Sequence, residues 1–183
     1  FFVLAHPILP VREMWVTGVD EWLPVLSWSA WVYFSLWVYI CLPSSLMRAP
    51  GALGHYLLGA LALSAVGLIV FVLIPTKVPV WDINWDLYPT LHFLKASDAS
   101  GNACPSLHVG FAVFAGLWNG VMLNRLKASR VWYLGNGLWC VAIVMSTMTT
   151  KQHVFIDVVM GALLGALIYG CNRWWVRRFG EIF

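Results

Sequence analysis

Residues 53–74 read LGHYLLGALALSAVGLIVFVLI, and this stretch decides the fold class. Of the Asp, Glu, Lys, Arg and His side chains, it contains only that of His55. A helix of about 20 mostly apolar residues is long enough to cross the roughly 30 Å hydrocarbon core of a bilayer. The stretch therefore predicts a transmembrane helix.

Four further stretches are also long and apolar enough to cross the bilayer: 23–41, 105–123, 131–149 and 154–171. Hydrophobic residues make up 61% of the 183-residue chain and charged residues only 10%, which would leave a soluble globule with almost no polar surface. The first residue is Phe1 rather than methionine, so we expect a sixth spanning helix that is truncated in this chain and ends near Pro7. The prediction is an all-α membrane protein, a six-transmembrane-helix bundle that forms one domain over residues 1–183.

Basic residues are concentrated on one side of the predicted membrane. This side comprises segments 42–52, 124–130 and 172–183, in which Glu181 is the only acidic residue. The basic residues of these segments are Arg48, Arg125, Lys127, Arg130, Arg173, Arg177 and Arg178. The positive-inside rule makes this side cytoplasmic, so residues 75–104 would face the periplasm or exterior of a bacterial inner membrane. The net charge of +3 is too small and too scattered to indicate a nucleic-acid partner.

Glycines four apart occur twice in the predicted helices. Gly116 pairs with Gly120, and Gly161 pairs with Gly165. Such spacing lets transmembrane helices approach closely. We therefore expect close helix contacts at both pairs.

His153 and Asp157 are four residues apart at the start of the last predicted helix. Side chains at this spacing share one face of a helix, so the carboxylate can accept a hydrogen bond from one ring nitrogen. That bond would fix the tautomer and leave the other nitrogen as a nucleophile. The alternative is a buried pair that only ties helices together.

The motif Pro105-Ser106-Leu107-His108 opens another predicted helix. Proline suits the first turn of a helix, and the free N–H groups there, with the Ser106 hydroxyl, would form a cradle for an anion. Lys77 lies on the same aqueous side, where it either lends charge to a phosphate or snorkels to the head groups. His108 itself is either part of the chemistry or a packed capping residue.

Two histidines and an acid are also the ligands of zinc or manganese sites. The chain has no HExxH motif and no carboxylate-rich cluster, so the prediction is no metal and no cofactor. The four cysteines show neither paired spacing nor a disulfide framework and are expected to be free thiols: Cys41, Cys104, Cys140 and Cys171.

These motifs resemble those of the type 2 phosphatidic acid phosphatase superfamily of membrane enzymes. Residues 101–109 are similar to its Pro-Ser-x-His motif, and residues 146–157 match its Ser-Arg-x5-His-x3-Asp motif at Ser146, His153 and Asp157. The resemblance covers roughly residues 75–165. It implies that His153 is the nucleophile, Asp157 its orienting partner and His108 the general acid.

The chain departs from the family pattern in its cations. Thr147 stands where the family has arginine, Leu107 stands where it usually has glycine, and Asn84-Trp85 replaces an Arg-Pro pair after Lys77. These losses resemble the branch that includes inositol phosphorylceramide synthases and bacterial phosphatase-like relatives. Lys151 is the candidate substitute for the arginine, so the expected phosphate-binding residues are Lys77, Ser106, Leu107, Ser146 and Lys151.

The predicted function is hydrolysis of a lipid phosphate monoester or diphosphate through a phosphohistidine. The predicted partners are this lipid phosphate substrate and the membrane lipids around the protein. One alternative is a phosphotransferase that passes a phospho-head group to a lipid or sugar hydroxyl. Another is a non-catalytic, lipid-binding membrane scaffold. Two interpretations fit the aromatic and acidic residues of the long loop: they would bind a sugar or inositol head group, or the tryptophans would belong to an interfacial aromatic belt. The residues are Trp81, Asp82, Trp85 and Asp86. No oligomeric state is predicted.

Overall fold

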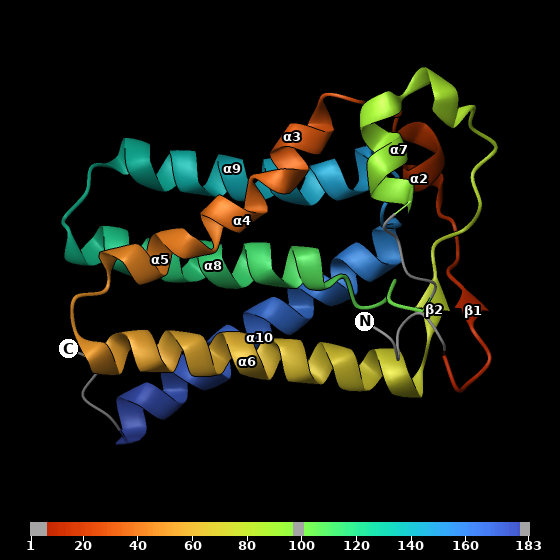
Figure 1. Ribbon diagram of the computed structural model, residues 1–183. Helices are drawn as coiled ribbons and strands as arrows, with labels where there is room; N and C mark the ends of the chain where they lie inside the picture. The colour runs from red at the N-terminus through yellow and green to blue at the C-terminus, as the bar shows by residue number, and fades with distance from the viewer. Residues whose placement is uncertain (1–6, 97–100, 180–183) are drawn as a thin grey trace.

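The computed structural model describes residues 7–96 and 101–179. Within these residues, five segments are long and apolar enough to cross a membrane: Ser29–Leu46, Pro50–Leu73, Leu107–Arg125, Arg130–Thr149 and Phe155–Arg178. The predicted all-α membrane bundle is therefore confirmed (Figure 1). The expected truncated helix before Pro7 lies outside the described residues.

Helix α8 (Leu107–Arg125) is the centre of the bundle. It packs against α10 (Phe155–Phe179), α9 (Arg130–Thr149) and α6 (Pro50–Leu73). Figure 1 shows α8 between α9 and α6, with α10 crossing behind. Half of α8 is buried, against 22–28% of the other spans, so the remaining helices leave most of their apolar side chains to the lipid.

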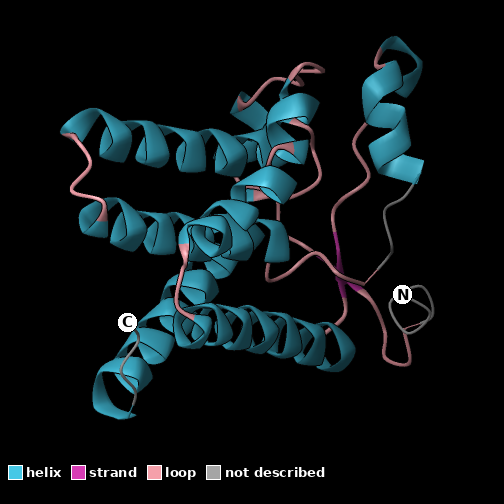
Figure 2. Cartoon of the chain, turned by 60° about the vertical axis from the view of Figure 1, so that its left-hand side comes forward, coloured by secondary structure: helices cyan, strands magenta, loops and turns pink. Residues whose placement is uncertain are grey.

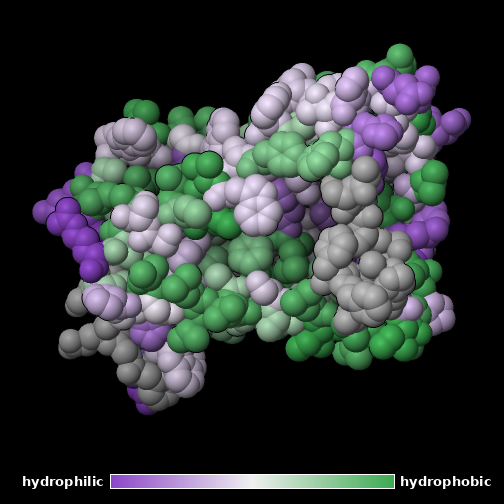
Figure 3. Space-filling model, in the orientation of Figure 1, coloured by the Kyte–Doolittle hydropathy of each residue, from purple (hydrophilic) through white to green (hydrophobic). Residues whose placement is uncertain are grey.

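The outer surface has the pattern expected of a protein in a bilayer. Figure 3 shows hydrophobic side chains over the flanks of the helices and hydrophilic ones gathered at the two ends of the bundle. Large exposed hydrophobic residues lie along the helices, among them Leu61, Leu134 and Leu167, each more than 60% exposed. Such a surface is stable only in contact with lipid, and the chain is an integral membrane protein.

Glycines explain how closely α8 and α10 approach. A Cβ atom at Gly161 would collide with the Ser106 carbonyl oxygen, and one at Gly165 would collide with that of Gly110. The close contact predicted at this pair is confirmed. The prediction for Gly120 is wrong, since a Cβ there would meet nothing within 4 Å.

The first span is broken into three short helices, α3 (Ser29–Phe34), α4 (Leu36–Tyr39) and α5 (Cys41–Leu46). The hydroxyl of Ser35 donates to the Val32 carbonyl oxygen at 2.6 Å, a bond that bends helices, and Pro43 lacks a backbone N–H. The span begins at Ser29 rather than at the predicted residue 23. The resulting bend carries α3 across α9 and α4 across α8.

One end of the bundle is covered by the segments before α3 and between α6 and α8; we call this the loop end. It carries α2 (Gly18–Trp22), the 3-10 helix η1 (Trp85–Leu87) and α7 (Pro89–Ala96). Strand β1 (Arg12–Glu13) pairs in parallel with β2 (Thr76–Lys77), with Arg12 opposite Thr76, and Thr76 forms a further bridge to Asn102. Figure 2 shows this small sheet beyond the ends of the helices. The residues before α8 are thereby fixed to the N-terminal segment.

Candidate active site

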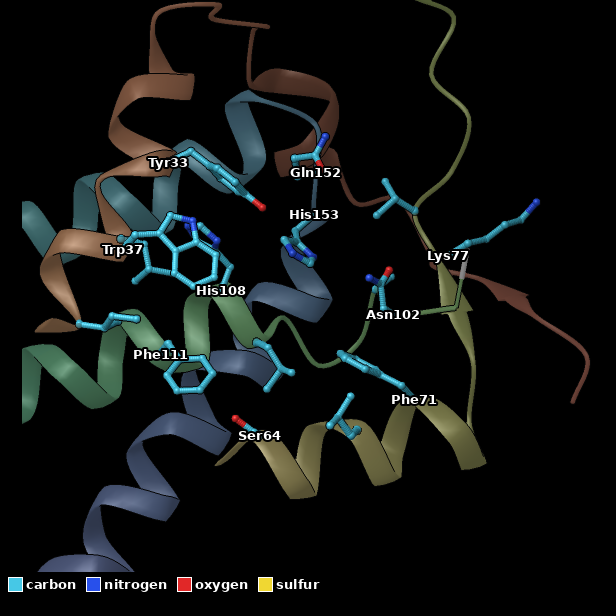
Figure 4. Close-up of a pocket in the computed structure, with 16 residues that line it drawn as sticks. Tyr33, Trp37, Ser64, Phe71, Lys77, Asn102, His108, Phe111, Gln152 and His153 are labelled. Atoms are coloured by element: carbon cyan, nitrogen blue, oxygen red, sulfur yellow. The ribbon is translucent and has the colours of Figure 1, made fainter. Parts of the chain in front are cut away.

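A cavity of about 680 Å³ opens at the loop end, between α3 and α4 on one side and α6 and α8 on the other (Figure 4). Polar residues line one part of it: Lys77, Asn102, His108, Gln152 and His153. Apolar residues line the rest: Leu36, Trp37, Ile40, Leu68, Phe71 and Phe111. The cavity therefore offers one polar region and one apolar wall to the same ligand.

His153 and Asp157 form the hydrogen bond that their spacing predicted. Nδ1 of His153 lies 2.9 Å from Oδ2 of Asp157, whose side chain is fully buried. His153 lies two residues before the start of α10, in a turn whose Gln152 and His153 N–H groups both donate to the Thr147 carbonyl oxygen, at 3.0 and 3.1 Å. With Nδ1 engaged, Nε2 is the ring nitrogen left for a ligand.

His108 is held by Tyr33, a residue that the sequence did not single out. The two rings stack with centroids 3.8 Å apart and planes 15° from parallel, and the imidazole also hydrogen-bonds to the Tyr33 backbone. Its Nε2 atom is buried and has no hydrogen-bond partner among the described residues. His108 and His153 line the same cavity and interact electrostatically, so both imidazoles border the space open to one ligand.

The predicted anion cradle at Ser106 is wrong in part. Helix α8 begins at Leu107, and Ser106 is its N-cap, with Oγ accepting a 3.3 Å hydrogen bond from the Val109 N–H. The Ser106 N–H donates to the Asp157 carbonyl oxygen at 3.0 Å. Serine is a favoured N-cap residue, which places Pro105 outside the helix. Of the predicted cradle, the N–H groups of Leu107 and His108 are at the first two helical positions, where an α-helix itself supplies no partner.

Lys77 lies at the rim of the cavity on strand β2. Its Nζ atom is 3.4 Å from Oε2 of Glu13, and both side chains are about half exposed. In Figure 4 the Lys77 side chain points away from His153. An exposed ion pair of this kind is weak, so a phosphate at the rim would compete with Glu13 for the ammonium group.

The structure contradicts the expected phosphate-binding role of Lys151. Its Nζ atom donates to the carbonyl oxygens of Asp20, at 2.6 Å, and Leu23, at 2.9 Å, and lies 4.4 Å from the Trp81 ring centroid. The side chain is 5% exposed and does not line the cavity. Burial lowers the pKa of Lys151, an effect that the Asp20 carboxylate opposes. The predicted direction of this side chain, toward the phosphate, is therefore wrong.

Ser146 is also directed away from the cavity. It is 2% exposed, and its hydroxyl donates to the Ile143 carbonyl oxygen at 2.6 Å within α9. Thr147, at the position of the family arginine, is fully buried and donates to the Val144 carbonyl oxygen. The Ser146 hydroxyl is therefore not directed into the cavity, where the phosphate contact was expected.

Two neutral amides occupy the region where cations were expected. Asn102 and Gln152 both line the cavity, and Figure 4 shows Asn102 beside His153. Nε2 of Gln152 is buried without a partner among the described residues. Amide groups donate hydrogen bonds to phosphate oxygens without adding charge. Nothing in the sequence distinguished these two residues from other polar residues near the motifs.

The tryptophans of the 75–104 segment bind lysines instead of lining the cavity. Lys151 lies over Trp81, and Lys95 lies over Trp85 with 5.2 Å between Nζ and the ring centroid. Cation–π pairs of this kind stabilise the packing of the loop end. They do not support the head-group site considered for these tryptophans.

There is no cluster of three or more His, Cys, Asp or Glu residues arranged to hold a metal ion within residues 7–96 and 101–179. The four cysteines are free thiols. Burial, with a further contribution from Asp157, raises the pKa of the Cys104 thiol to about 11, so this neighbour of the site stays protonated at neutral pH and is a poor nucleophile.

The family model of the PAP2 superfamily matches residues 56–181. The match includes both histidines, Asp157 and most of the cavity lining. No curated protein and no solved structure matches the chain.

Proposed function

Because the chain belongs to the PAP2 superfamily, whose members are phosphatases or phosphotransferases acting on phosphate esters, we propose that it hydrolyses a lipid phosphate monoester or diphosphate through a phosphohistidine. The observation that carries the proposal is the cavity shared by His153 and His108. One imidazole is fixed by a carboxylate, and the other has a buried Nε2 without a partner among the described residues. A nucleophile and an acid for the leaving group are what phosphoryl transfer requires.

The proposed reaction has two steps. Nε2 of His153 attacks phosphorus, the bond from phosphorus to the leaving oxygen breaks, and protonated His108 donates its Nε2 proton to that oxygen. Neutral His108 then takes a proton from water as the water oxygen attacks the phosphohistidine, which releases inorganic phosphate and restores His153. Asp157 stabilises the positive charge on the His153 ring through the Nδ1 hydrogen bond.

The lining of the cavity supports a lipid as the substrate. The phosphate would lie beside the two imidazoles and accept hydrogen bonds from Asn102 and Gln152, while a hydrocarbon chain would lie against apolar residues such as Leu68 and Phe111. Burying a chain on this wall removes apolar surface from water, about 25 cal/mol for each Å². A small water-soluble phosphate would leave the wall empty.

We propose a bacterial inner membrane as the location, and the charge distribution supports an orientation with the loop end in the periplasm. Basic residues such as Arg48, Arg125 and Arg130 flank the opposite end, which the positive-inside rule makes cytoplasmic. Cysteines introduced singly at Asp82 and Ser129, in a chain without native cysteines, test this orientation. An impermeant thiol reagent added to intact cells should label the residue 82 variant only, and the reverse labelling would refute the orientation.

A second function, transfer of a phospho-head group to a hydroxyl acceptor, is favoured by the scarcity of cations. Lys77 is the only Lys or Arg among the residues described as lining the cavity, and its ammonium pairs with Glu13. Neutral amides suit a phosphodiester with one negative charge better than a monoester with two. The acceptor would then be a lipid or sugar hydroxyl in place of water.

A substrate panel separates these functions. The purified protein in lipid nanodiscs is incubated with lipid phosphate monoesters, diphosphates and phosphodiesters, each with and without a diacylglycerol or inositol acceptor. Inorganic phosphate and new phospholipid are measured, with His153→Ala as the blank. Phosphate released without an acceptor supports the phosphatase, and product that needs an acceptor supports the transferase. Absence of both products from the whole panel would favour the non-catalytic scaffold.

A further inference from the structure

A buried carboxylate at the loop end contacts the turn that carries His153. Asp20 is 2% exposed, and its Oδ1 atom accepts a 2.7 Å hydrogen bond from the N–H of Phe155, the first residue of α10. Its Oδ2 atom accepts hydrogen bonds from the N–H and the hydroxyl of Thr17, at 2.8 and 2.7 Å. A distant segment of the chain thus supplies a partner for an N–H group that the helix itself cannot satisfy.

The other side of the same turn is also anchored. Lys151 donates through Nζ to the carbonyl oxygens of Asp20 and Leu23, and its own carbonyl oxygen accepts a 2.6 Å hydrogen bond from Nζ of Lys95. The Lys151 backbone has a φ of 55°, a left-handed conformation that residues with a Cβ atom adopt uncommonly. A strained backbone persists only where its surroundings fix it, and these bonds do so two residues before His153.

We infer that Asp20 and Lys151 are positioning residues, which hold the 151–155 turn so that the His153 ring faces His108 across the cavity. The side chain of Asp157 fixes the ring of His153 relative to α10. The bonds of Asp20 and Lys151 fix the turn itself relative to residues 20–23, and Leu23 belongs to the same buried apolar cluster as Val109 of α8. The expected effect of these residues on turnover rests on the proposed function. Their effect on the geometry of the 151–155 turn does not depend on any activity.

A merely stabilising role would give a different pattern from a positioning role. If the hydrogen bonds of Asp20 only stabilise the fold, the loss of any one of them should lower stability without altering the position of the His153 ring. Thr17→Val provides this control, because it removes the hydroxyl bond to Oδ2 of Asp20 and leaves the bond from Asp20 to Phe155 in place. Asp20→Asn is the conservative variant, since it keeps an oxygen that can accept from Phe155.

The test uses the full chain in nanodiscs and three measurements. Hydrogen exchange reports the Phe155 amide, ¹⁵N spectra of labelled histidine report the tautomer and environment of His153, and steady-state kinetics report kcat and KM. Asp20→Ala should speed exchange at Phe155, shift the His153 ring signals and lower kcat roughly 10- to 100-fold, the loss expected from a small displacement of a reacting group. KM should change little, and Asp20→Asn should recover part of the loss.

Lys151 is tested with a matched pair of variants. Lys151→Ala and Lys151→Gly both remove the ammonium group, but only glycine adopts the positive φ without strain. Both should shift the His153 signals, with the larger shift in the alanine variant.

The inference is overturned if the Asp20→Ala spectra and exchange match those of Thr17→Val, or if both Lys151 variants keep the wild-type His153 signals. If Asp20→Ala does not fold, these comparisons are made with Asp20→Asn, whose His153 signals should lie between those of wild type and the shifted Lys151 variants. If the wild-type protein turns over no substrate but the variants shift the His153 signals as expected, the proposed function is refuted and the positioning role stands.

Discussion

The imidazole of His108 stacks on the phenol ring of Tyr33, with 3.8 Å between the ring centroids and 15° between the planes. The two residues come from α8 and from the bent first span, so the bend in that span supplies one wall of the site. Together with the hydrogen bond to the Tyr33 backbone, the stack fixes the direction in which Nε2 points.

Two substitutions of Tyr33 distinguish the contribution of its ring from that of its hydroxyl group. Tyr33→Leu should lower kcat for alkyl phosphates roughly tenfold or more, because an acid that is free to rotate donates its proton less often. Tyr33→Phe keeps the stack and should retain most of the activity. Steady-state kinetics of the two variants decide the matter, and equal losses would show that the hydroxyl, rather than the stack, is what matters.

The role of His108 as an acid predicts a dependence on the leaving group. His108→Ala should retain far more activity toward nitrophenyl phosphate, whose leaving group needs no proton, than toward an alkyl phosphate. The measurement is kcat/KM for both substrates in wild type and variant. A loss of the same size for both substrates would mean that His108 binds the substrate but transfers no proton.

The sequence was most informative where the interaction was local. The bond between His153 and Asp157 was predicted from their spacing of four residues, and it forms although His153 lies just before α10 rather than within it. The spans were predicted because a bilayer demands long apolar helices. Contacts between distant segments gave no such signal. The stack of Tyr33 on His108 and the burial of Lys151 against Asp20 depend on where the first span bends and on how α2 packs, and neither follows from periodicity.

The proposed role of the neutral amides as donors to the phosphate is tested with two variants of Gln152. Gln152→Ala should lower kcat roughly 100-fold, which is the lower end of the loss expected for one donor to developing negative charge. Gln152→Glu has nearly the same shape but adds a negative charge beside the phosphate, so its activity should be lower still. Phosphate release assays test both variants. Near-normal turnover in Gln152→Ala would remove this residue from the phosphate site, leaving Asn102 to be tested in the same way.

Close packing of α8 against α10 predicts opposite outcomes for two glycines. Gly165→Ala should destabilise the protein by about 1–3 kcal/mol, the usual cost of forcing an extra carbon into a packed interior, because its Cβ collides with the Gly110 backbone. Gly120→Ala places its Cβ in open space and should be neutral or slightly stabilising within a helix. Thermal unfolding in detergent measures both. Equal melting temperatures would argue against the close helix contact.

The formation of a phosphohistidine at His153 is tested most directly by trapping it. Wild-type protein is mixed with a ³²P-labelled lipid phosphate, quenched in alkali, digested and analysed by mass spectrometry, with His153→Ala and His108→Ala treated in parallel. The expected result is an acid-labile phosphoryl group on the peptide that carries His153, absent from His153→Ala. With a substrate that has a good leaving group, His108→Ala should accumulate more label, because water is no longer activated for the second step. Turnover by wild-type protein with no label on His153 at any time, or undiminished turnover by His153→Ala, would contradict the mechanism.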